Sequence, residues 1–430
     1  MLPASQAEAM ILDLVQPLDG KRHGEVVTLL TAIDRILAAP VVSQLDFPHW
    51  DNSAMDGYAV RYEDVKSCHA DQPVALEIVE EVRAGQAPKR EVKPGQAARI
   101  FTGGVMPSGA DTVVMQEYTK REGDRVMILA APPAEKAFVR QGASYYQAGT
   151  PLLLPGIALQ PPELAVLAAA QCTQIKVYRR PRVAILSTGD ELITPDQPLQ
   201  LGQIVDSNQY ALAALVAQTG AEPLHLGIFP DKPNILRRAI SQAIATADVV
   251  LSSGGVSVGD YDYVEQILAE LGATIHIRAV AVKPGKPLTF ATFPASAASK
   301  HKPVLYFGLP GNPVSALVSF WRFVQPALRK LSGLAHSWGP MFVQARSQHD
   351  LKSDGQRETY LWGQLHLIDG AYEFHLADGS HSSGNLINLA QTNGLAVIPI
   401  GQPAIAKGAT IRVLQVGTPL IPLTQSQKQY

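Results

Sequence analysis

Short apolar runs alternate with amphipathic segments from Arg182 to about Leu331, and this alternation restricts the fold more than any other feature of the 430 residues. The runs predicted to be strands are Val183–Leu186, Leu224–Phe229, Val249–Leu251, Ile275–Val282 and Val304–Phe307. The segments with helical spacing are Gln209–Gln218, Asn234–Ala245, Tyr261–Leu271 and Pro313–Leu328. Such alternation is typical of a doubly wound parallel sheet, which binds ligands beyond the carboxyl ends of its strands. The predicted fold class is therefore multidomain α/β.

The middle of this stretch, from Asp248 to Asp262, reads D-V-V-L-S-S-G-G-V-S-V-G-D-Y-D. Its β-branched run ends in the paired glycines Gly254 and Gly255 and then leads into a helical segment. Glycines let backbone N–H groups approach an anion, the helix N-terminus favours negative charge, and Asp260 or Asp262 could hold a divalent cation. The motif predicts a phosphate and metal site, although strand–glycine–helix turns without any ligand are also common.

The rest of the chain divides into segments that differ in hydrophobic periodicity and in their turn residues. Helical spacing predicts helices over Ser5–Val15, Val26–Leu37 and an alanine-rich segment from Pro161 through Ala170. Alternating runs predict strands at Ala75–Val82, Gln96–Phe101, Thr112–Tyr118 and Arg125–Ala130, and strands with Asp-Gly turns return between Phe342 and Val416. We predict a discontinuous helical domain (1–43 and 141–178), an inserted mostly β domain (44–140), the α/β domain (179–331) and a small C-terminal β domain (332–430).

Composition excludes several classes of protein. The formal net charge of −2 argues against a dominant nucleic-acid surface. Two cysteines, Cys68 and Cys172, offer neither a disulfide framework nor metal-ligand spacing, and we expect two ordinary buried thiols. No signal-peptide pattern and no apolar run of about 18 residues occurs, so we expect a cytoplasmic protein that does not bind membranes.

Acidic residues follow three of the predicted strands. Ser187-Thr188-Gly189-Asp190-Glu191 follows the first strand, Pro230-Asp231 the second, and the central glycine loop carries Asp260 and Asp262. Hard carboxylate oxygens suit Mg²⁺, which usually binds through one or two carboxylates together with substrate phosphates. Helix capping would explain Asp190 and Asp231 equally well, and the sequence leaves that alternative open.

Two further motifs offer groups for an anion. Lys283-Pro284-Gly285-Lys286-Pro287 places two ammonium groups three residues apart on a stiff turn, which suits phosphate or a metal oxyanion. Leu309-Pro310-Gly311-Asn312-Pro313-Val314-Ser315 offers backbone donors and the Ser315 hydroxyl at a helix start. A plain turn with an N-cap would also explain the second motif.

Two stretches outside the α/β domain lack the period of a strand or helix. They are the polar and aromatic Phe47–Tyr58 and the end of a strand at Arg99–Gly104, and periodicity assigns them no role. The chain has no H-E-x-x-H and no G-x-x-x-x-G-K-[ST] motif. A zinc hydrolase and a P-loop enzyme are therefore not expected.

Seven ordered motifs together resemble the molybdopterin molybdenumtransferases, the MoeA and gephyrin E-domain family. In chain order these motifs are Asp51–Ala59, Ile100–Gly103, Ser187–Leu192, Asp206–Asn208, Gly254–Gly259, Lys283–Pro287 and Leu309–Ala316. The resemblance covers nearly the whole chain. It implies a homodimer of four-domain subunits in which the discontinuous helical domain serves dimerisation, with the active cleft between the α/β domain of one subunit and the β domain of its partner.

The resemblance also implies the reaction, in which adenylylated molybdopterin and molybdate give molybdenum cofactor and AMP with the help of Mg²⁺. It implies that the α/β domain binds molybdopterin and that a molybdopterin adenylyltransferase is a candidate partner. The implied catalytic residues are Asp56, Thr102, Glu191, Asp231 and Asp262, of which Glu191, Asp231 and Asp262 would hold the metal. The implied substrate and molybdate contacts are Asp206, Ser207, Gly254, Gly255, Ser257, Lys283, Lys286, Gly311, Asn312, Ser315 and, by looser matches, Arg357 and Ser383.

One departure from the family pattern stands at Arg140-Gln141-Gly142-Ala143-Ser144, where an acidic pair is expected in place of Ala143 and Ser144. The departure keeps a second function open, a non-catalytic scaffold or molybdopterin-binding protein on the same fold. A third alternative is a nucleotide hydrolase or adenylyltransferase that uses the α/β domain alone. That alternative leaves the motifs at Asp56 and Thr102 unexplained.

Overall fold

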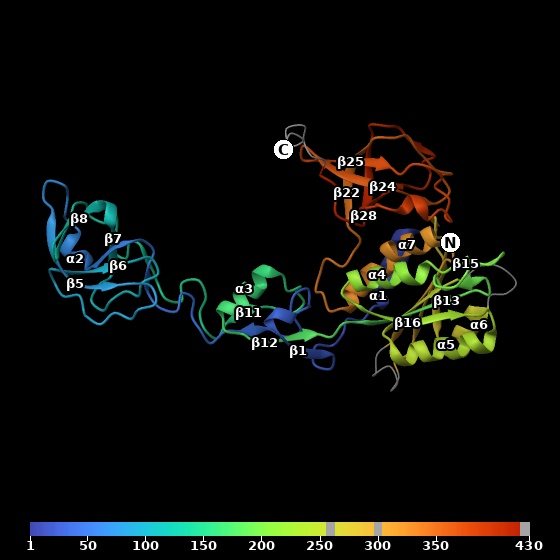
Figure 1. The fold of residues 1–430 in the computed structure, drawn as a ribbon, viewed down its shortest axis with the longest axis horizontal. Coiled ribbons are helices and arrows are strands. Elements are labelled where there is room, and N and C mark those ends of the chain that lie inside the picture. The colour runs from blue at the N-terminus through green and yellow to red at the C-terminus, as the bar shows by residue number, and fades with distance from the viewer. Residues whose placement is uncertain (255–262, 296–302, 422–430) are drawn as a thin grey trace. The chain divides into compact units, whose positions relative to one another are not determined.

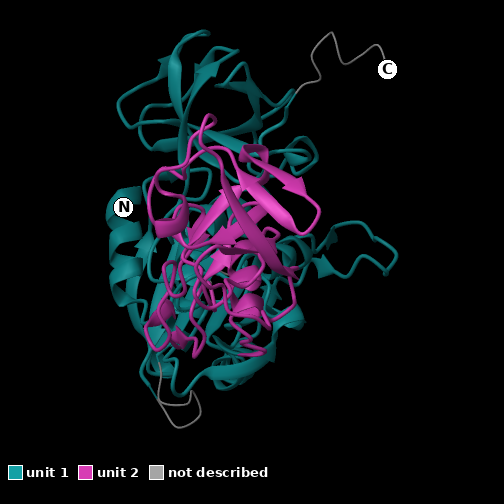
Figure 2. Ribbon diagram, turned by 90° about the vertical axis from the view of Figure 1, so that its left-hand side faces the viewer, with its two compact units in different colours: residues 1–38, 156–160, 175–430 teal, residues 39–155, 161–174 magenta. Residues whose placement is uncertain are grey.

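The computed structural model describes residues 1–254, 263–295 and 303–421. The chain forms two compact units, shown in two colours in Figure 2. Unit 1 comprises residues 1–38, 156–160 and 175–430, and unit 2 comprises residues 39–155 and 161–174. The predicted division into four domains is finer than these units and stays a prediction.

A six-stranded sheet forms the centre of unit 1. Its strand order is β16 (Glu222–Phe229), β13 (Arg182–Thr188), β17 (Val249–Ser253), β21 (Val304–Leu309), β20 (Pro287–Phe293) and β18 (Thr274–Ala279). The first four strands are parallel, as predicted, and β20 and β18 extend the sheet in antiparallel pairings. The α/β fold class is confirmed, and β20 is an addition that the sequence analysis did not predict.

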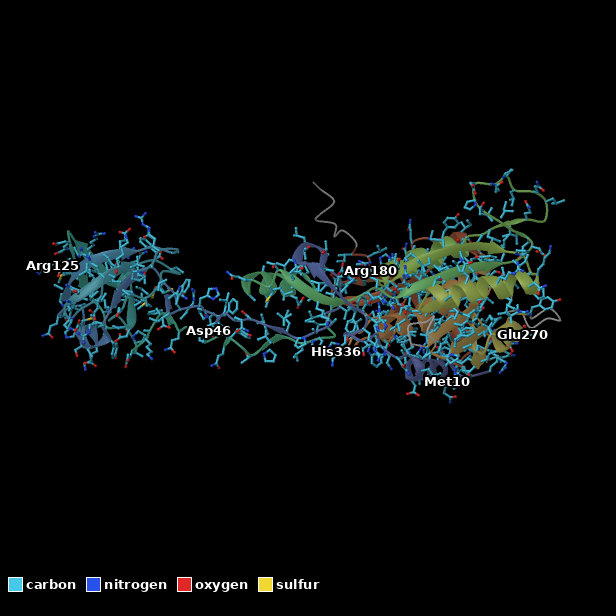
Figure 3. All side chains as sticks on the ribbon, turned by 90° about the horizontal axis from the view of Figure 1, so that it is seen from below. Met10, Asp46, Arg125, Arg180, Glu270 and His336 are labelled. Carbon is cyan, nitrogen blue, oxygen red and sulfur yellow. The ribbon has the colours of Figure 1, made fainter. Side chains whose placement is uncertain are left out.

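Helices cover both faces of this sheet (Figure 1). One face carries α1 (Ala4–Leu14), α4 (Asn208–Gln218) and the continuous run of α7 (Pro313–Ser319), a π-helical segment (Phe320–Val324) and α8 (Gln325–Leu331). The other face carries α5 (Pro233–Thr246) and α6 (Tyr263–Glu270). Successive strand residues enter opposite cores, for example Ala184 and Ile185, because strand side chains alternate. Glu270, labelled in Figure 3, joins α6 to α5 through an ion pair with Arg237 at 2.6 Å.

The C-terminal part of unit 1 is a small closed sheet, which confirms the predicted terminal β domain. Its strands are β24 (Glu358–Ile368), β25 (Ala371–Leu376), β22 (Phe342–Ser347), β28 (Thr410–Gln415) and β26 (Gly394–Ile398). The additional pairing of β26 with β24 closes the ring. The predicted Asp-Gly turn joins β24 to β25, with positive φ at both Asp369 and Gly370. The short strand β19 (Val282–Lys283) adds to β24, so the lysine loop is attached to this sheet.

Unit 2 is built on a second six-stranded sheet. Its order is β7 (Thr112–Met115), β4 (Gly57–Val60), β6 (Gln96–Ile100), β5 (Val74–Val82), β9 (Arg125–Ile128) and β8 (Thr119–Glu122). The predicted strands of this region are confirmed, except that Thr112–Tyr118 ends in a 3-10 turn from Gln116 to Tyr118. Neighbouring residues such as Tyr58 and Ala59 enter separate hydrophobic clusters, so both faces of the sheet are covered. The helix α2 (Tyr62–Val65) contributes Val65 to one of the clusters.

The predicted helix over Val26–Leu37 is wrong. Residues Gly24–Thr28 form strand β1, which pairs with β12 (Gln174–Tyr178), and Leu29–Thr31 form a 3-10 turn. The β-branched run Val26-Val27-Thr28 favours a strand over a helix once a partner strand is available. The predicted helices at Ser5–Val15 and from Pro161 are confirmed as α1 and α3 (Pro161–Ala169).

Short strands also occur in the ranges predicted to be mainly helical or loop-like. In unit 2, β2 (Val41–Val42) pairs with β11 (Pro151–Leu153), and β3 (Asn52–Ser53) pairs with β10 (Val139–Arg140).

Among the residues that the structure describes, no helix is both long enough and apolar enough to cross a bilayer.

Candidate active site

Acidic residues gather where β13 and β16 end. The N–H of Gly189 donates to the carbonyl of Phe229 at 3.2 Å, which ties the two strand ends together. The N–H of Asp231 then donates to the Asp190 carboxylate at 3.3 Å. The pKa of Asp231 is raised, first by desolvation and second by the negative charges of Asp190 and Glu191, although the residue remains accessible to solvent. The Asp231 carboxylate is thus close enough to the carboxylates of Asp190 and Glu191 to be repelled by both.

These acids suit a hard cation, because a bound cation would relieve the repulsion that the raised pKa of Asp231 reports. Within residues 1–254, 263–295 and 303–421, no three Asp, Glu, His or Cys side chains form a ready metal site. The predicted ligand Asp262 lies outside the described residues, as does the alternative Asp260. Glu191 and Asp231 therefore fit Mg²⁺ as part of a ligand set that bound phosphates would complete.

Two glycine turns meet beside the acids. Gly254 ends β17 with φ +91°, and a Cβ there would lie 2.3 Å from the carbonyl oxygen of Thr188. Its N–H donates to the Leu309 carbonyl at 3.2 Å, and a Cβ on Gly311 would lie 3.7 Å from the Gly254 Cα. The close approach requires glycine, and it brings the ends of β17 and β21 together at the carboxyl edge of the sheet. The predicted binding of an anion by backbone donors there stays a prediction. The predicted contacts Gly255 and Ser257 lie outside the described residues.

Asn208 links these turns, a role that the sequence analysis did not assign. Its Nδ2 donates to the Ser253 Oγ at 2.6 Å and to the Gly311 carbonyl at 2.8 Å. Its Oδ1 is buried and accepts no hydrogen bond from the described part of the chain. The same holds for the hydroxyls of Ser187 and Thr188 at the end of β13. Buried polar atoms are normally satisfied, so these three atoms fit a site that a polar ligand completes.

Asp206 and Ser207 lie at the start of α4. The buried Asp206 carboxylate accepts from the backbone N–H of Gln209 at 3.2 Å and from its Nε2 at 3.3 Å. Asp206 therefore orders the N-terminal turn of the helix that carries Asn208. The Ser207 hydroxyl makes no capping hydrogen bond, and the predicted contact of Asp206 and Ser207 with substrate stays a prediction.

The lysine loop and the closed sheet bring cations together. The register pairs Val282 with Glu358 and Lys283 with Thr359, so Arg357 comes next to the loop. Lys283 Nζ donates to the Asp354 carboxylate at 2.9 Å, and Arg357 Nη2 lies 3.7 Å from the same oxygen. The sequence predicts Lys283 and Arg357 as oxyanion contacts, whereas no local pattern marks Asp354.

The same loop presses against α7. Gly285 has φ +113°, and a Cβ there would meet the Ser319 Oγ at 2.9 Å and the Ser315 carbonyl oxygen at 3.5 Å. Ser315 is buried in the first turn of α7. Lys286 follows Gly285, and its carbonyl accepts from the N–H of Val280 at 3.0 Å.

A loop of the closed sheet reaches the start of α7. Asn312 Nδ2 donates to the Ser383 Oγ at 3.2 Å, and the N–H of Val314 donates to the Ser383 carbonyl at 3.2 Å. Residues that are far apart in sequence, Asn312 and Ser383 here and Lys283 and Arg357 beside the loop, are thus neighbours in unit 1.

In unit 2, Asp56 and Thr102 form a pair. The Asp56 Oδ1 accepts from the Thr102 N–H at 2.7 Å and from its hydroxyl at 2.9 Å. These two donors lower the pKa of the exposed Asp56 carboxyl, and the nearby Arg99 adds to the effect. Arg99 lies over the rings of Tyr58 and Phe101, at 5.0 and 4.9 Å from their centroids. The two residues that the sequence predicted together are therefore held together, with an ionised carboxylate.

Comparison with known proteins identifies the family to which this chain belongs. Family models match residues 2–170 as the MoeA N-terminal region (domain I and II), 184–330 as a probable molybdopterin binding domain and 344–416 as the MoeA C-terminal region (domain IV). The molybdopterin molybdenumtransferase of a Nostoc species is 65% identical over 95% of this chain and 92% of its own length. The chain belongs to the molybdopterin molybdenumtransferase (MoeA) family. The Haemophilus influenzae molybdopterin molybdenumtransferase is 34% identical, covering 92% of this chain and 96% of its own.

A solved MoeA structure agrees with this membership. The molybdopterin biosynthesis moeA protein of Pyrococcus horikoshii superposes with a TM-score of 0.80 at 29% identity, over 96% of this chain and all of that chain. The resemblance inferred from the seven motifs is therefore confirmed at the level of family and fold.

Ala143 and Ser144, where the sequence is expected to depart from the MoeA pattern, lie in a tight turn of unit 2. Ala143 has φ +59°, and its N–H donates to the Pro48 carbonyl at 3.0 Å. The Ser144 hydroxyl donates to the Gln141 carbonyl at 2.7 Å. Asp51 accepts from the N–H of Gly142 at 2.7 Å, so the polar stretch Phe47–Tyr58 keeps a carboxylate beside this turn.

Proposed function

We propose that this protein inserts molybdate into adenylylated molybdopterin, with Mg²⁺-dependent release of AMP. It is an enzyme of molybdenum cofactor biosynthesis, a molybdopterin molybdenumtransferase. The observation that carries the detailed proposal is the convergence of Lys283 and Arg357 from segments far apart in sequence. Paired cations of this kind suit a dianionic metal oxyanion.

The acid side of the site would serve the phosphoanhydride. Glu191, Asp231 and Asp262 would hold Mg²⁺, which neutralises charge on the departing AMP. Backbone N–H groups of the turns at Gly255 and Gly311 would bind phosphate oxygens where negative charge develops. Gly254, whose own N–H bonds to the Leu309 carbonyl, would let the turn come close to the ligand. Asp206, Ser207, Ser257 and Asn312 would complete the contacts with the pterin substrate.

The cation side would bind molybdate. Lys283, Lys286 and Arg357 offset the repulsion between a dianion and the nearby phosphates, and Ser315 and Ser383 supply hydroxyl donors. Molybdate would bind there first and move to the dithiolene sulfurs as AMP leaves. Asp56 and Thr102 would act in the same reaction, and an Asp56→Asn variant should lose turnover while it still binds molybdate.

The deciding experiment measures AMP release from adenylylated molybdopterin by the purified protein, with and without molybdate and with and without Mg²⁺. AMP release that requires both molybdate and Mg²⁺ supports the proposal. Tight binding of the substrate without release would instead favour a scaffold or storage role, which the Ala143-Ser144 departure leaves open. Restoring acids at those two positions would then be the next variant to measure.

The proposal extends to assembly. We expect a homodimer and a molybdopterin adenylyltransferase as the partner that delivers the substrate. Light scattering by the purified protein at micromolar concentration measures its molecular mass in solution. A mass equal to that of one chain contradicts the dimer. Faster AMP release from substrate supplied by the adenylyltransferase than from free substrate supports delivery.

A further inference from the structure

Asp354 stands between the two cations of the proposed molybdate side. Its Oδ2 accepts from Lys283 Nζ at 2.9 Å and lies 3.7 Å from Arg357 Nη2. Its Oδ1 accepts from the N–H of Gln356 at 3.0 Å, which fixes the orientation of the carboxylate. The side chains of Lys283, Arg357 and Asp354 are 43%, 23% and 31% exposed, so a dissolved anion can reach all three.

The charge of Asp354 is stable at neutral pH. The hydrogen bond from Lys283 lowers the pKa of its carboxyl most, followed by the N–H of Gln356. The carboxylate therefore occupies the Lys283 ammonium and lies beside the Arg357 guanidinium, the two cations that an oxyanion would use. An arriving oxyanion meets a cation pair whose charge is already partly compensated.

We propose that Asp354 is a positioning residue that acts as an internal competing anion, which molybdate must displace from Lys283 and Arg357. The inference rests on the proposed function, since it assumes that these cations bind the oxyanion. Competition by the Asp354 carboxylate weakens the binding of every anion to these cations. Anions that bind weakly, such as sulfate, therefore do not fill the site. It also keeps the bound molybdate from being held too tightly, because the carboxylate returns to the cations when molybdate moves to the sulfurs.

The test compares oxyanion binding by calorimetry to the full-length protein and to Asp354→Asn. The amide keeps the shape and an oxygen for the N–H of Gln356 but loses the charge. We expect the Kd for molybdate and for sulfate to fall about three- to fivefold, which is the range of a half-exposed ion pair. In the AMP-release assay the KM for molybdate should fall while kcat stays equal or decreases.

Asp369→Asn is the matched control. Asp369 lies on the exposed β24–β25 turn of the same closed sheet, and asparagine tolerates its φ of +49°. This variant removes the same charge without touching the cation pair, so its Kd values should equal those of the wild type. A Kd that falls equally in both variants would show that net charge alone matters and would overturn the inference.

The remaining outcomes separate the inference from the function on which it rests. Unchanged or weaker oxyanion binding in Asp354→Asn overturns the inference and makes Asp354 an anchor for Lys283. Lys283→Ala with wild-type molybdate binding overturns instead the proposed molybdate side. Should Asp354→Asn fail to fold by circular dichroism, Asp354→Ser keeps an oxygen for the turn and is judged by the same Kd comparison.

Discussion

At the scale of single residues, Asp231 shows that a site can oppose the stability of the fold that carries it. Its raised pKa means that the folded state binds the proton more tightly than the unfolded state does. As the pH rises from the unfolded pKa through the folded pKa, stability is therefore lost and stays lost at neutral pH. The cation that we propose for this site would offset the repulsion with Asp190 and Glu191.

We therefore expect Asp231→Asn to melt at a higher temperature than the wild type at pH 7 without Mg²⁺, by up to about 2 °C, since half-exposed charges contribute less than about 1 kcal/mol. Mg²⁺ should raise the melting temperature of the wild type more than that of the variant, because the variant lacks one of the carboxylates proposed to bind the ion. At pH 4 the advantage of the variant without Mg²⁺ should shrink. A variant that melts lower than the wild type at pH 7 contradicts the account.

Arg322 is a buried cation on the π-helical segment. It is 2% exposed, donates to the Glu8 carboxylate and to the Tyr360 hydroxyl at 2.9 Å, and lies 4.0 Å from the Glu358 carboxylate. Replacing one member of a buried ion pair leaves the others without a counter-charge, which is strongly destabilising.

Arg322→Met should lower the free energy of unfolding in urea by about 3–5 kcal/mol, because methionine fills the space but leaves Glu8 and Glu358 uncompensated. Arg278→Met is the control, because Arg278 and its partner Glu265 are 63% and 31% exposed. Its effect should stay below about 1 kcal/mol. Equal losses of unfolding free energy in Arg322→Met and Arg278→Met would show that the buried ion cluster around Arg322 contributes no more to stability than an exposed ion pair.

At the scale of elements, the end of β17 depends on one glycine. Gly254 combines a positive φ with a Cβ position 2.3 Å from a backbone oxygen of β13. Gly227 in β16 has a similar φ of +98°, and apart from its two chain neighbours no described residue has an atom within 4 Å of its Cβ position. The two glycines thus separate the effect of backbone conformation from that of close approach.

Gly227→Ala should destabilise unit 1 by about 1–2 kcal/mol, the strain of a non-glycine residue at positive φ. Gly254→Ala should lose more than about 3 kcal/mol, because β13 and β17 must also move apart. Urea unfolding measures both values, and AMP release should survive only in Gly227→Ala. Equal losses in the two variants would mean that the close approach at Gly254 relaxes without effect.

Elements with strong periodicity were predictable from the sequence, and elements decided by their partners were not. The helices on both sheet faces and the parallel strands follow from local patterns. The predicted helix over Val26–Leu37 failed because its β-branched run pairs with β12, a tertiary event. The site followed the same rule. Loop motifs predicted Lys283, Gly254 and Asn312, whereas Asp354 and the linking role of Asn208 arise only when β19 meets β24 and two strand ends converge.

At the scale of the whole molecule, the chain leaves unit 1 and returns to it. The ends of the segment 39–155 are held together inside unit 2, since β2 pairs with β11 and Phe47 bridges Tyr146. Two hydrophobic clusters cover the faces of its sheet. The segment therefore has its own core and its own closure.

A fragment of residues 39–155 should fold alone, because its closure and both clusters lie within it. We expect a cooperative urea transition and a strand-rich circular dichroism spectrum. The same fragment with Ile100→Asp is the control and should show no transition, since Ile100 is fully buried in one cluster. A wild-type fragment without a cooperative transition would contradict its independence.

Because β24 follows the α/β sheet in the sequence, its pairing with β19 can form only after every strand of that sheet has been synthesised. The strands of the α/β sheet end at Leu309, whereas Arg357 and Ser383 are added only as the closed sheet emerges from the ribosome. A chain released early, before Arg357, has every strand of the α/β sheet but lacks half of the cation pair and the hydroxyl beside Asn312. Translation therefore completes the proposed oxyanion site last, and a chain released before Arg357 lacks part of it.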